Sequence, residues 1–453
     1  MCGNFTHHGP STLEATGHYV IWALADGLPR RISLNIILLN DYGYAEGGAS
    51  RVALIQAEAL AARGHKVQFF VAQASASDPR AVDSTQTRTI PMHATGQWDL
   101  THDPRPSAAA FRGLWNMRSS AEFADQLARF SPEDTVVIVH SWNKALSSSV
   151  IRRAYQSGFA VVCVAHDFSV ACPNGALYNY QTRSPCDLRP MAAACLRTHC
   201  DKQSYPHKLW RVARQVIQEQ WGGVPNNIDA LIFVSESAHS IIKPWLPKNL
   251  AQYVLANPLP LPPAGTRQPD VAVNQAFVFA GRLSPEKGAL LLAEATQSLG
   301  HPVTFIGDGE QRNLIRETLP CARITGWLSS DQVWQELAQA RALVFPSVCR
   351  ETFGLVVYEA AALGIPAIVP KNSVVTEFVR HGHNGLTFAA GDSSALNEQL
   401  QLLADRPQWA AKLGEQAQQD LRVLDLSPAR HVERLEHILV DARHAASNKR
   451  SVR

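Results

Sequence analysis

The chain has 453 residues, of which 46% are hydrophobic and 18% are charged, and its formal net charge at pH 7 is +3. At about one domain per 150 residues, this length predicts roughly two or three domains. The composition excludes a disordered chain, and so small a net charge gives no indication of a nucleic-acid partner.

Residues 1–31 are expected to form an N-terminal extension of uncertain structure. They lack the basic start, apolar run and small-residue cleavage site of a secretory signal. The chain also lacks a run of about eighteen consecutive apolar residues, the length that a membrane-spanning helix requires. We therefore expect a cytoplasmic protein, with the inner face of the membrane as an alternative location.

Residues 32–262 alternate short apolar strands with longer helical stretches, which is the pattern of a parallel sheet with crossover helices. The expected strands of this first domain are 32–39, 66–72, 134–140, 159–166, 230–235 and 252–257.

The Pro-rich stretch 256–273 predicts a linker, placed at 263–275, and the alternation then restarts in a second domain, 276–425. Its expected strands are 276–281, 301–307, 321–326, 341–347, 365–370 and 385–390. Residues 426–453 predict a C-terminal helix that packs back on the first domain and ends in a basic tail. Two doubly wound units place the carboxyl ends of their strands at a common cleft, where ligands usually bind.

Two glutamates flank the predicted start of a helix in the second domain. Glu351 lies in the loop before it and Glu359 inside it. The amides of Gly354, Leu355 and Val356 would be unpaired donors that attract phosphate, and Gly354 would let an anion approach the backbone. The carboxylates suit hydroxyl pairs. The alternative is a capping carboxylate and a tolerated surface glutamate.

Other strand-to-helix loops supply cations and glycines. Arg282 and Lys287 follow one strand of the second domain, positioned for the charge of a diphosphate, although two solvated surface cations are the common alternative. Gly307 turns another strand into a helix. Gly47 and Gly48 follow the first strand of the chain, where they permit close approach of a phosphate or sugar.

Ten blocks occur together in one order: "GGASRV", "ARGHKV", "VHSW", "AHDFSVACPNG", "VSESAH", "ANPLP", "AGRLSPEKG", "IGDGEQ", "GWLSSDQV" and "ETFGLVVYEAAALGIPAIV". In this the chain resembles the retaining GT-B glycosyltransferases of family four, the glycosyl transferases group 1, from about residue 32 to 385. The resemblance implies an α/β fold of two Rossmann-like domains that face a central cleft. The first would be the acceptor side and the second would bind the nucleotide sugar.

The resemblance implies that Glu351 contacts the hydroxyls of the donor sugar and that Glu359 binds the ribose. Arg282 and Lys287, with the amides of the helix start, would hold the diphosphate, and Gly47 with its neighbour Gly48 would line the donor site. No cofactor or metal is implied, since cations replace Mg²⁺. The acceptor would be a sugar, a glycan or a lipid-linked glycan, as in polysaccharide biosynthesis.

The histidines depart from the family pattern, which has His-x-His where this chain has His140 and Trp142. A core histidine is at least as good an interpretation of His140 as a catalytic one. His166 ends the next strand at the ligand face, so we expect it to act there as a catalytic residue, with Asp167 orienting it.

Four cysteines crowd into an insert, 171–205, that would lie over the acceptor side of the cleft. They are Cys172, Cys186, Cys195 and Cys200. A subset of the family shares the "HD" and "CP" pattern with further cysteines. The spacing is not that of paired C-x2-C ligands, so a metal site, free thiols and a conditional disulfide all stay open.

The helical stretch 207–221 carries Lys208, Arg211 and Arg214 beside apolar residues. This pattern fits a peripheral membrane contact, which would suit a lipid-linked acceptor, but ordinary docking on the sheet is the favoured interpretation.

The function expected from this sequence is retaining transfer of a sugar from a nucleoside-diphosphate sugar to a glycan or glycolipid. One alternative is a nucleotide-sugar epimerase of the same fold. The other is a degenerate, non-catalytic scaffold, for which Trp142 in place of histidine is the argument.

Overall fold

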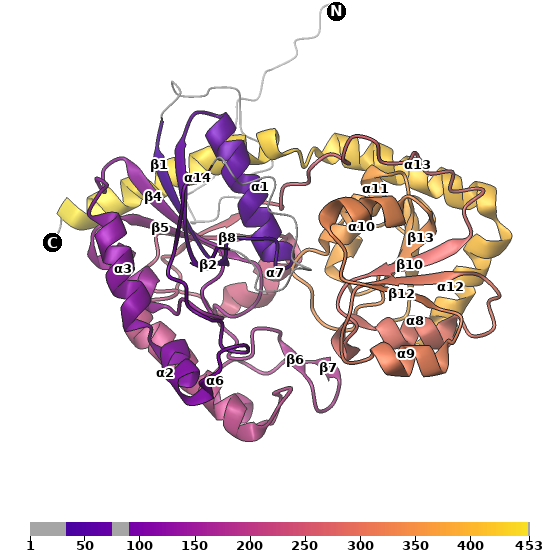
Figure 1. The fold of residues 1–453 in the computed structure, drawn as a ribbon, viewed down its shortest axis with the longest axis horizontal. Coiled ribbons are helices and arrows are strands. Elements are labelled where there is room, and N and C mark those ends of the chain that lie inside the picture. The colour runs from indigo at the N-terminus through magenta and orange to yellow at the C-terminus, as the bar shows by residue number, and fades with distance from the viewer. Residues whose placement is uncertain (1–32, 75–89, 452–453) are drawn as a thin grey trace, which may run out of the picture.

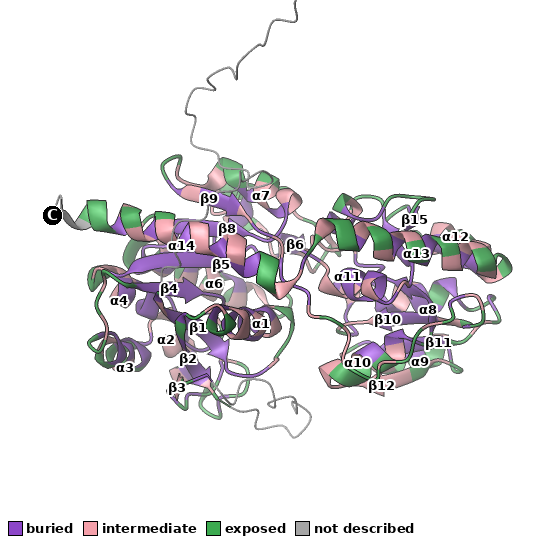
Figure 2. Cartoon of the chain, turned by 90° about the horizontal axis from the view of Figure 1, so that it is seen from above, coloured by how far each residue is buried: buried purple, intermediate pink, exposed green. Residues whose placement is uncertain are grey.

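The structure is a computed structural model that describes residues 33–74 and 90–451, so the predicted N-terminal extension lies outside the described residues. Two α/β halves lie beside one another, each with a central parallel sheet covered by helices on both faces (Figure 1). The central strands are the most deeply buried elements of both halves (Figure 2). This is the predicted fold class.

The first half is built on a seven-stranded sheet in the order β3-β2-β1-β4-β5-β8-β9. Its strands are β1 (Asn35–Tyr42), β2 (Lys66–Gln73), β3 (Met92–Ala94), β4 (Thr135–Val139), β5 (Ala160–Ala165), β8 (Ala230–Phe233) and β9 (Ala251–Val254). Its helices include α1 (Gly48–Ala62), α2 (Pro106–Leu114), α3 (Met117–Leu127), α4 (Ser149–Gln156), α6 (Tyr205–Ile217), the short π-helix η1 (Gln218–Gly222) and α7 (Glu236–Ile242). The sequence did not predict β3, because three residues carry too little periodicity.

The second half has a six-stranded parallel sheet in the order β12-β11-β10-β13-β14-β15. The strands are β10 (Ala276–Ala280), β11 (Val303–Ile306), β12 (Arg323–Gly326), β13 (Ala340–Val344), β14 (Ala367–Pro370) and β15 (Gly385–Phe388). The helices are α8 (Ala289–Ala295), α9 (Arg312–Thr318), α10 (Ser330–Leu337), α11 (Leu355–Ala362), α12 (Ser393–Asp405) and α13 (Pro407–Leu424). All six strands overlap the ranges that the sequence predicts.

The last helix, α14 (Pro428–Ser451), returns to the first half and packs on α1, β4 and β5 (Figure 1). Its inward residues Val432, Leu435 and Ile438 are fully buried. Arg63 at the end of α1 donates two hydrogen bonds, of 2.9 and 2.6 Å, to Glu436. The chain therefore crosses between the halves twice. Within the described ranges no helix is long and apolar enough to cross a membrane.

Candidate active site

An ion pair lies in the loops that end β10 and β13 of the second half. The Lys287 ammonium donates to Glu351 Oε1 at 2.5 Å, and the Ser347 hydroxyl donates to the same oxygen at 2.7 Å. Burial by itself raises the pKa of Glu351, but Lys287 and Ser347 outweigh it and hold that pKa below its usual value. Burial lowers the pKa of Lys287 and Glu351 raises it, and the net result is a pKa of Lys287 above its usual value. Both groups are therefore charged at neutral pH.

Helix α11 begins at Leu355, directly after the Glu351 loop, so the amides of Leu355 and Val356 belong to its first turn. Gly354 caps the helix with a left-handed φ of +79°. A β-carbon at Gly354 would lie 2.4 Å from the Val375 side chain. Packing and backbone conformation therefore require a glycine here, whether or not an anion approaches the helix start.

Glu359 is 3% exposed and pairs with Arg51 of α1, across the boundary between the two halves. The same N-terminal loop holds Gly47, which has a φ of +116°, and Gly48. A β-carbon at either glycine would meet no atom within 4 Å. The structure thus brings both predicted glycines and the second glutamate to one place, with open space at the glycines.

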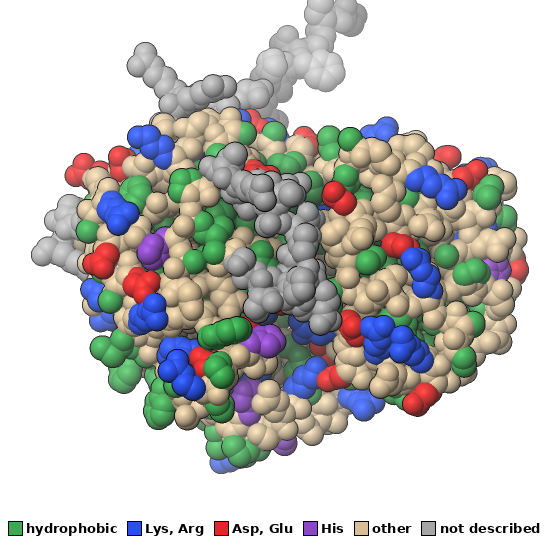
Figure 3. Space-filling model, in the orientation of Figure 1, with side chains coloured by type: hydrophobic (Ala, Val, Ile, Leu, Met, Phe, Trp, Pro, Cys, Tyr) green, Lys and Arg blue, Asp and Glu red, His purple; other side chains and the backbone are tan. Residues whose placement is uncertain are grey.

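Arg282 is exposed at the end of β10, near enough to Lys287 for its charge to oppose protonation of that amine. Gly307, a candidate donor-binding glycine, directly follows β11. Its φ is +133°, and a β-carbon there would lie 2.0 Å from the Gly281 carbonyl oxygen. The close approach of two strand ends therefore explains Gly307 without a ligand. Figure 3 shows a hollow between the halves with histidine and cationic side chains at its edge.

His166 of the first half lies where the two halves meet. The hydroxyl of Thr352, the residue after Glu351, donates to the His166 carbonyl oxygen at 2.8 Å. Its imidazole belongs to a buried chain of hydrogen bonds. His166 Nε2 and His140 Nδ1 are 2.9 Å apart, and His140 Nε2 lies 3.0 Å from Gln56 Oε1. Gln56 Nε2 then lies 2.9 Å from His431 Nε2, in α14.

This series of hydrogen bonds ends at the backbone of Ala256, whose carbonyl oxygen is 2.9 Å from His431 Nδ1. A carbonyl oxygen only accepts, so His431 Nδ1 carries the proton and its Nε2 accepts from the Gln56 amide. Gln56 Oε1 then accepts from His140 Nε2, which leaves His140 Nδ1 to accept from His166 Nε2. In the neutral state, therefore, His166 Nδ1 carries the free lone pair.

All three imidazoles are neutral at physiological pH. Burial lowers the pKa of His166 and of His431 to about 4, and it lowers the pKa of His140 well below the usual value. His140 is 3% exposed and bonded at both nitrogens, which agrees with the core-histidine interpretation.

One expectation about these residues is wrong. Asp167 does not orient His166, because its carboxylate accepts from the Ser169 amide at 2.8 Å and His140 takes the orienting role. Trp142, which stands where the family pattern has a histidine, is 3% exposed and its Nε1 donates to Gln218 at 3.0 Å.

The Cys-rich insert contacts the second half beside Glu351. Arg350 donates to the Cys186 carbonyl oxygen at 2.7 Å and pairs with Asp187. The thiols surround an ammonium group, since Lys208 Nζ lies 3.0 Å from Cys200 Sγ and 3.6 Å from Cys195 Sγ. Among the described residues no cluster of three or more potential ligands could hold a metal. The metal alternative for Cys172 and its three companions is therefore not supported.

Sequence reasoning missed Arg51, Gln56 and His431. Arg51 lies 308 positions from Glu359, and Gln56 lies 375 positions from His431. Each looks like an ordinary helical polar residue in sequence. One signal was present, since Gln56 falls on the face of α1 that is otherwise apolar and buried.

Comparison with known proteins agrees with this geometry. Residues 272–420 match the family described as glycosyl transferases group 1, and residues 47–241 match the glycosyl transferase 4-like domain. A glycogen synthase of Mycobacterium tuberculosis strain H37Rv is 27% identical over 404 residues, which cover 83% of this chain and 86% of that protein.

Solved structures share the fold. The sucrose-phosphate synthase of Thermosynechococcus elongatus has a TM-score of 0.65 at 20% identity, covering 90% of this chain and 100% of that one. HepE of Anabaena, solved in complex with UDP and glucose, has a TM-score of 0.64 at 16% identity, covering 90% and 99%. From both family matches and the two facing Rossmann-like halves, the chain belongs to the GT-B glycosyltransferases of group 1.

Proposed function

We propose that the protein is a retaining glycosyltransferase that moves a sugar from a nucleoside-diphosphate sugar to a glycan or glycolipid acceptor. The observation that carries the proposal is the charged Lys287–Glu351 pair directly before the start of α11. A carboxylate accepts hydrogen bonds from sugar hydroxyls, while an ammonium and helix amides stabilise negative charge on phosphate. One loop system therefore offers both kinds of partner that a sugar diphosphate needs.

In this proposal Arg282 and Lys287 stabilise the charge that grows on the diphosphate as its bond to the sugar breaks. Glu351 accepts from the sugar hydroxyls, and Glu359 accepts from the ribose hydroxyls. Arg51 holds Glu359 from the other half, so the ribose site is completed only when both halves meet. The open backbone at Gly47 and Gly48 faces the same place.

The protonation states of the cleft support retention. Burial keeps the pKa of His166 at about 4, and Lys287 with Ser347 keeps the pKa of Glu351 low despite burial. Both side chains are therefore weak bases at neutral pH. The leaving diphosphate can take the proton of the acceptor hydroxyl instead. Because the diphosphate leaves from one face of the sugar, it then guides the acceptor to that same face, which retains the configuration. His166 then acts through hydrogen bonding, with Nδ1 as an acceptor.

The first experiment is a calorimetric panel of UDP-, GDP- and ADP-sugars, followed by transfer to an oligosaccharide acceptor with the anomeric configuration read by NMR. A donor that binds identifies the base, and a product with the donor's configuration supports retention. Glu351→Ala should abolish transfer while nucleotide binding persists. Unchanged turnover would exclude this role for Glu351, and an inverted product would exclude retention.

Two outcomes favour the alternatives. If none of the sugar nucleotides binds, the protein is a non-catalytic scaffold. If a bound donor changes configuration without an acceptor, it is an epimerase. Trp142 is buried and donates to Gln218, so the cleft lacks a histidine from this position, and the donor-binding panel decides between an enzyme and a scaffold.

A further inference from the structure

Helix α6 is turned with its apolar face to solvent. Leu209 is 47% exposed and Val216 44% exposed, and Ala213 between them is also exposed. The inward positions are polar, since Lys208 is fully buried and Gln215 is 2% exposed. An ordinary surface helix has the opposite arrangement. Of the two interpretations of this stretch, docking on the sheet and a peripheral membrane contact, neither anticipated that Lys208 would lie on the buried face.

The inward polar groups of α6 have partners, so this arrangement is a consistent part of the fold. Lys208 donates to Cys200 Sγ at 3.0 Å, and Gln215 donates to the Val170 carbonyl oxygen at 3.2 Å. Arg214 donates to the carbonyl oxygen of Pro173 at 3.2 Å. Because the polar face of α6 forms hydrogen bonds inside the first half, the apolar face of α6 has to point outward.

The apolar face continues onto neighbouring elements. Helix α2 lies beside α6 at the edge of the first half that is remote from the second half (Figure 1), and Trp210 Nε1 of α6 donates to the carbonyl oxygen of Ala110 at 3.1 Å. We define the α2–α6 surface as five apolar side chains that are 44–77% exposed. These are Phe111, Met117, Leu209, Val216 and Trp221. A gathering of exposed large apolar residues indicates an interaction site.

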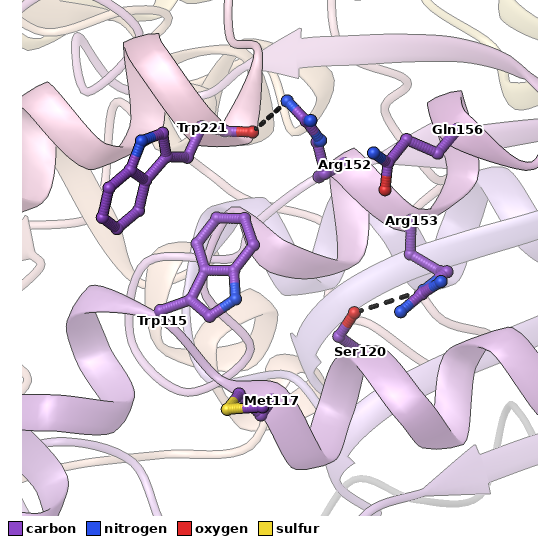
Figure 4. Close-up of a pocket in the computed structure, with 7 residues that line it drawn as sticks. All are labelled: Trp115, Met117, Ser120, Arg152, Arg153, Gln156 and Trp221. Carbon is purple, nitrogen blue, oxygen red and sulfur yellow. Dashed lines mark hydrogen bonds between the residues drawn. The ribbon is translucent and has the colours of Figure 1, made fainter.

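A cationic hollow adjoins this surface. Its volume is about 390 Å³, and Figure 4 shows Arg152 and Arg153 lining it together with the rings of Trp115 and Trp221. The two rings are in edge contact, with centroids 6.3 Å apart. Arg152 Nη1 donates to the Trp221 carbonyl oxygen at 2.9 Å, which fixes one guanidinium beside the indole.

The charges favour an anionic occupant. Neither α2 nor α6 contains an acidic residue, and Glu219 of η1 accepts from Gln215 at 2.8 Å. A second copy of the same surface would therefore offer no carboxylate from these helices to Arg152 and Arg153. An anionic bilayer offers phosphates to the arginines and an acyl boundary to exposed Trp, Phe and Met side chains.

We propose that the α2–α6 surface docks the protein on an anionic lipid bilayer. Headgroup phosphates lie at Arg152 and Arg153, and the five apolar side chains enter the boundary between headgroups and acyl chains. Helix α6 directly follows the insert that contacts Arg350 of the second half. The proposal concerns a partner and does not depend on which sugar is transferred.

The test is co-sedimentation of the full chain, without donor, with vesicles of phosphatidylcholine alone or mixed with phosphatidylglycerol. The wild type should sediment with the mixed vesicles and stay in solution with the neutral ones. The triple variant Phe111→Ser/Met117→Ser/Trp221→Ser should lose at least tenfold in binding. A matched control, Leu261→Ser/Val273→Ser/Val423→Ser, changes side chains that are 86%, 67% and 87% exposed elsewhere and should bind like the wild type.

Arg152→Gln and Arg153→Gln should each weaken binding about fivefold, since one cation near an anionic surface contributes on the order of 1 kcal/mol. The urea midpoints of all variants should match the wild type, which excludes misfolding. Failure of the wild type to sediment, or equal loss in the control, would overturn the proposal. So would a wild-type dimer in light scattering that the Phe111 triple variant converts to a monomer. Nucleotide binding in solution is unaffected in either case, so the proposed transfer reaction is tested separately.

Discussion

Replacing Lys287 with methionine should destabilise the unliganded protein. The change removes the ammonium that lies 2.5 Å from Glu351 Oε1 and leaves the carboxylate with the Ser347 hydroxyl and the Cys349 thiol as its hydrogen-bond donors. An uncompensated charge in a desolvated site is more costly than the pair is stabilising. We therefore expect a loss of folding stability that exceeds the value of an ordinary surface ion pair.

The exposures of the two side chains determine the magnitude. Losing one partner of a fully buried pair costs about 3–5 kcal/mol, and a solvent-exposed pair contributes about 0–1 kcal/mol. Glu351 keeps 16% of its side-chain exposure and Lys287 keeps 32%, so this pair is only partly desolvated. We expect a loss of about 2 kcal/mol at neutral pH.

The loss should depend on pH. In the wild type the pKa of Glu351 is depressed, so its contribution to stability is present above the unfolded pKa and is lost as pH falls through the folded value. Without Lys287, burial dominates and the pKa of Glu351 should rise above the unfolded value. The destabilisation of the variant should therefore be largest at neutral pH and shrink as pH falls toward about 4.

Urea unfolding at roughly pH 7.5 and roughly pH 5 measures the loss of stability as a shift in the unfolding midpoint at constant slope. The double variant Lys287→Met/Glu351→Leu is the control, because an apolar pair of similar volume should restore most of the stability. A single variant as stable as the wild type, or a double variant no more stable than the single one, would show that Lys287 does not compensate the charge of a desolvated Glu351.

Three further predictions follow from other contacts. Gln56→Leu leaves two buried imidazole nitrogens without partners and should cost about 2–6 kcal/mol in urea unfolding; it should also lower kcat more than it raises the donor KM, because His166 loses its fixed tautomer. Glu359→Gln should raise the Kd of the nucleoside diphosphate about tenfold in calorimetry, since an amide offers one acceptor to two hydroxyls, and an unchanged Kd would contradict the ribose role. Gly307→Ala should cost about 3 kcal/mol, because its β-carbon would meet a carbonyl oxygen at 2.0 Å, whereas Gly391→Ala, with an open surrounding at φ +77°, should cost about 1 kcal/mol in the same assay.

The fold class and the loops of the site could be predicted from local sequence patterns. Apolar runs such as 276–281 have the length of buried parallel strands and are bounded by turn residues, so neighbouring residues alone are enough to recognise them. The carboxyl ends of such strands meet at one edge of the sheet, so Lys287 and Glu351 were predictable as neighbours. The position of Glu359 in the helix after Glu351 followed from spacing alone.

The partners of these residues depend on how the two halves and the last helix pack together. Arg51 reaches Glu359, and Gln56 joins His140 to His431, only because α1 lies against the second half and α14 returns to the first. Such contacts join residues hundreds of positions apart, and no local pattern encodes them. The orientation of α6 has the same cause: its own sequence shows an amphipathic helix, but the polar partners inside the first half determine which face meets solvent.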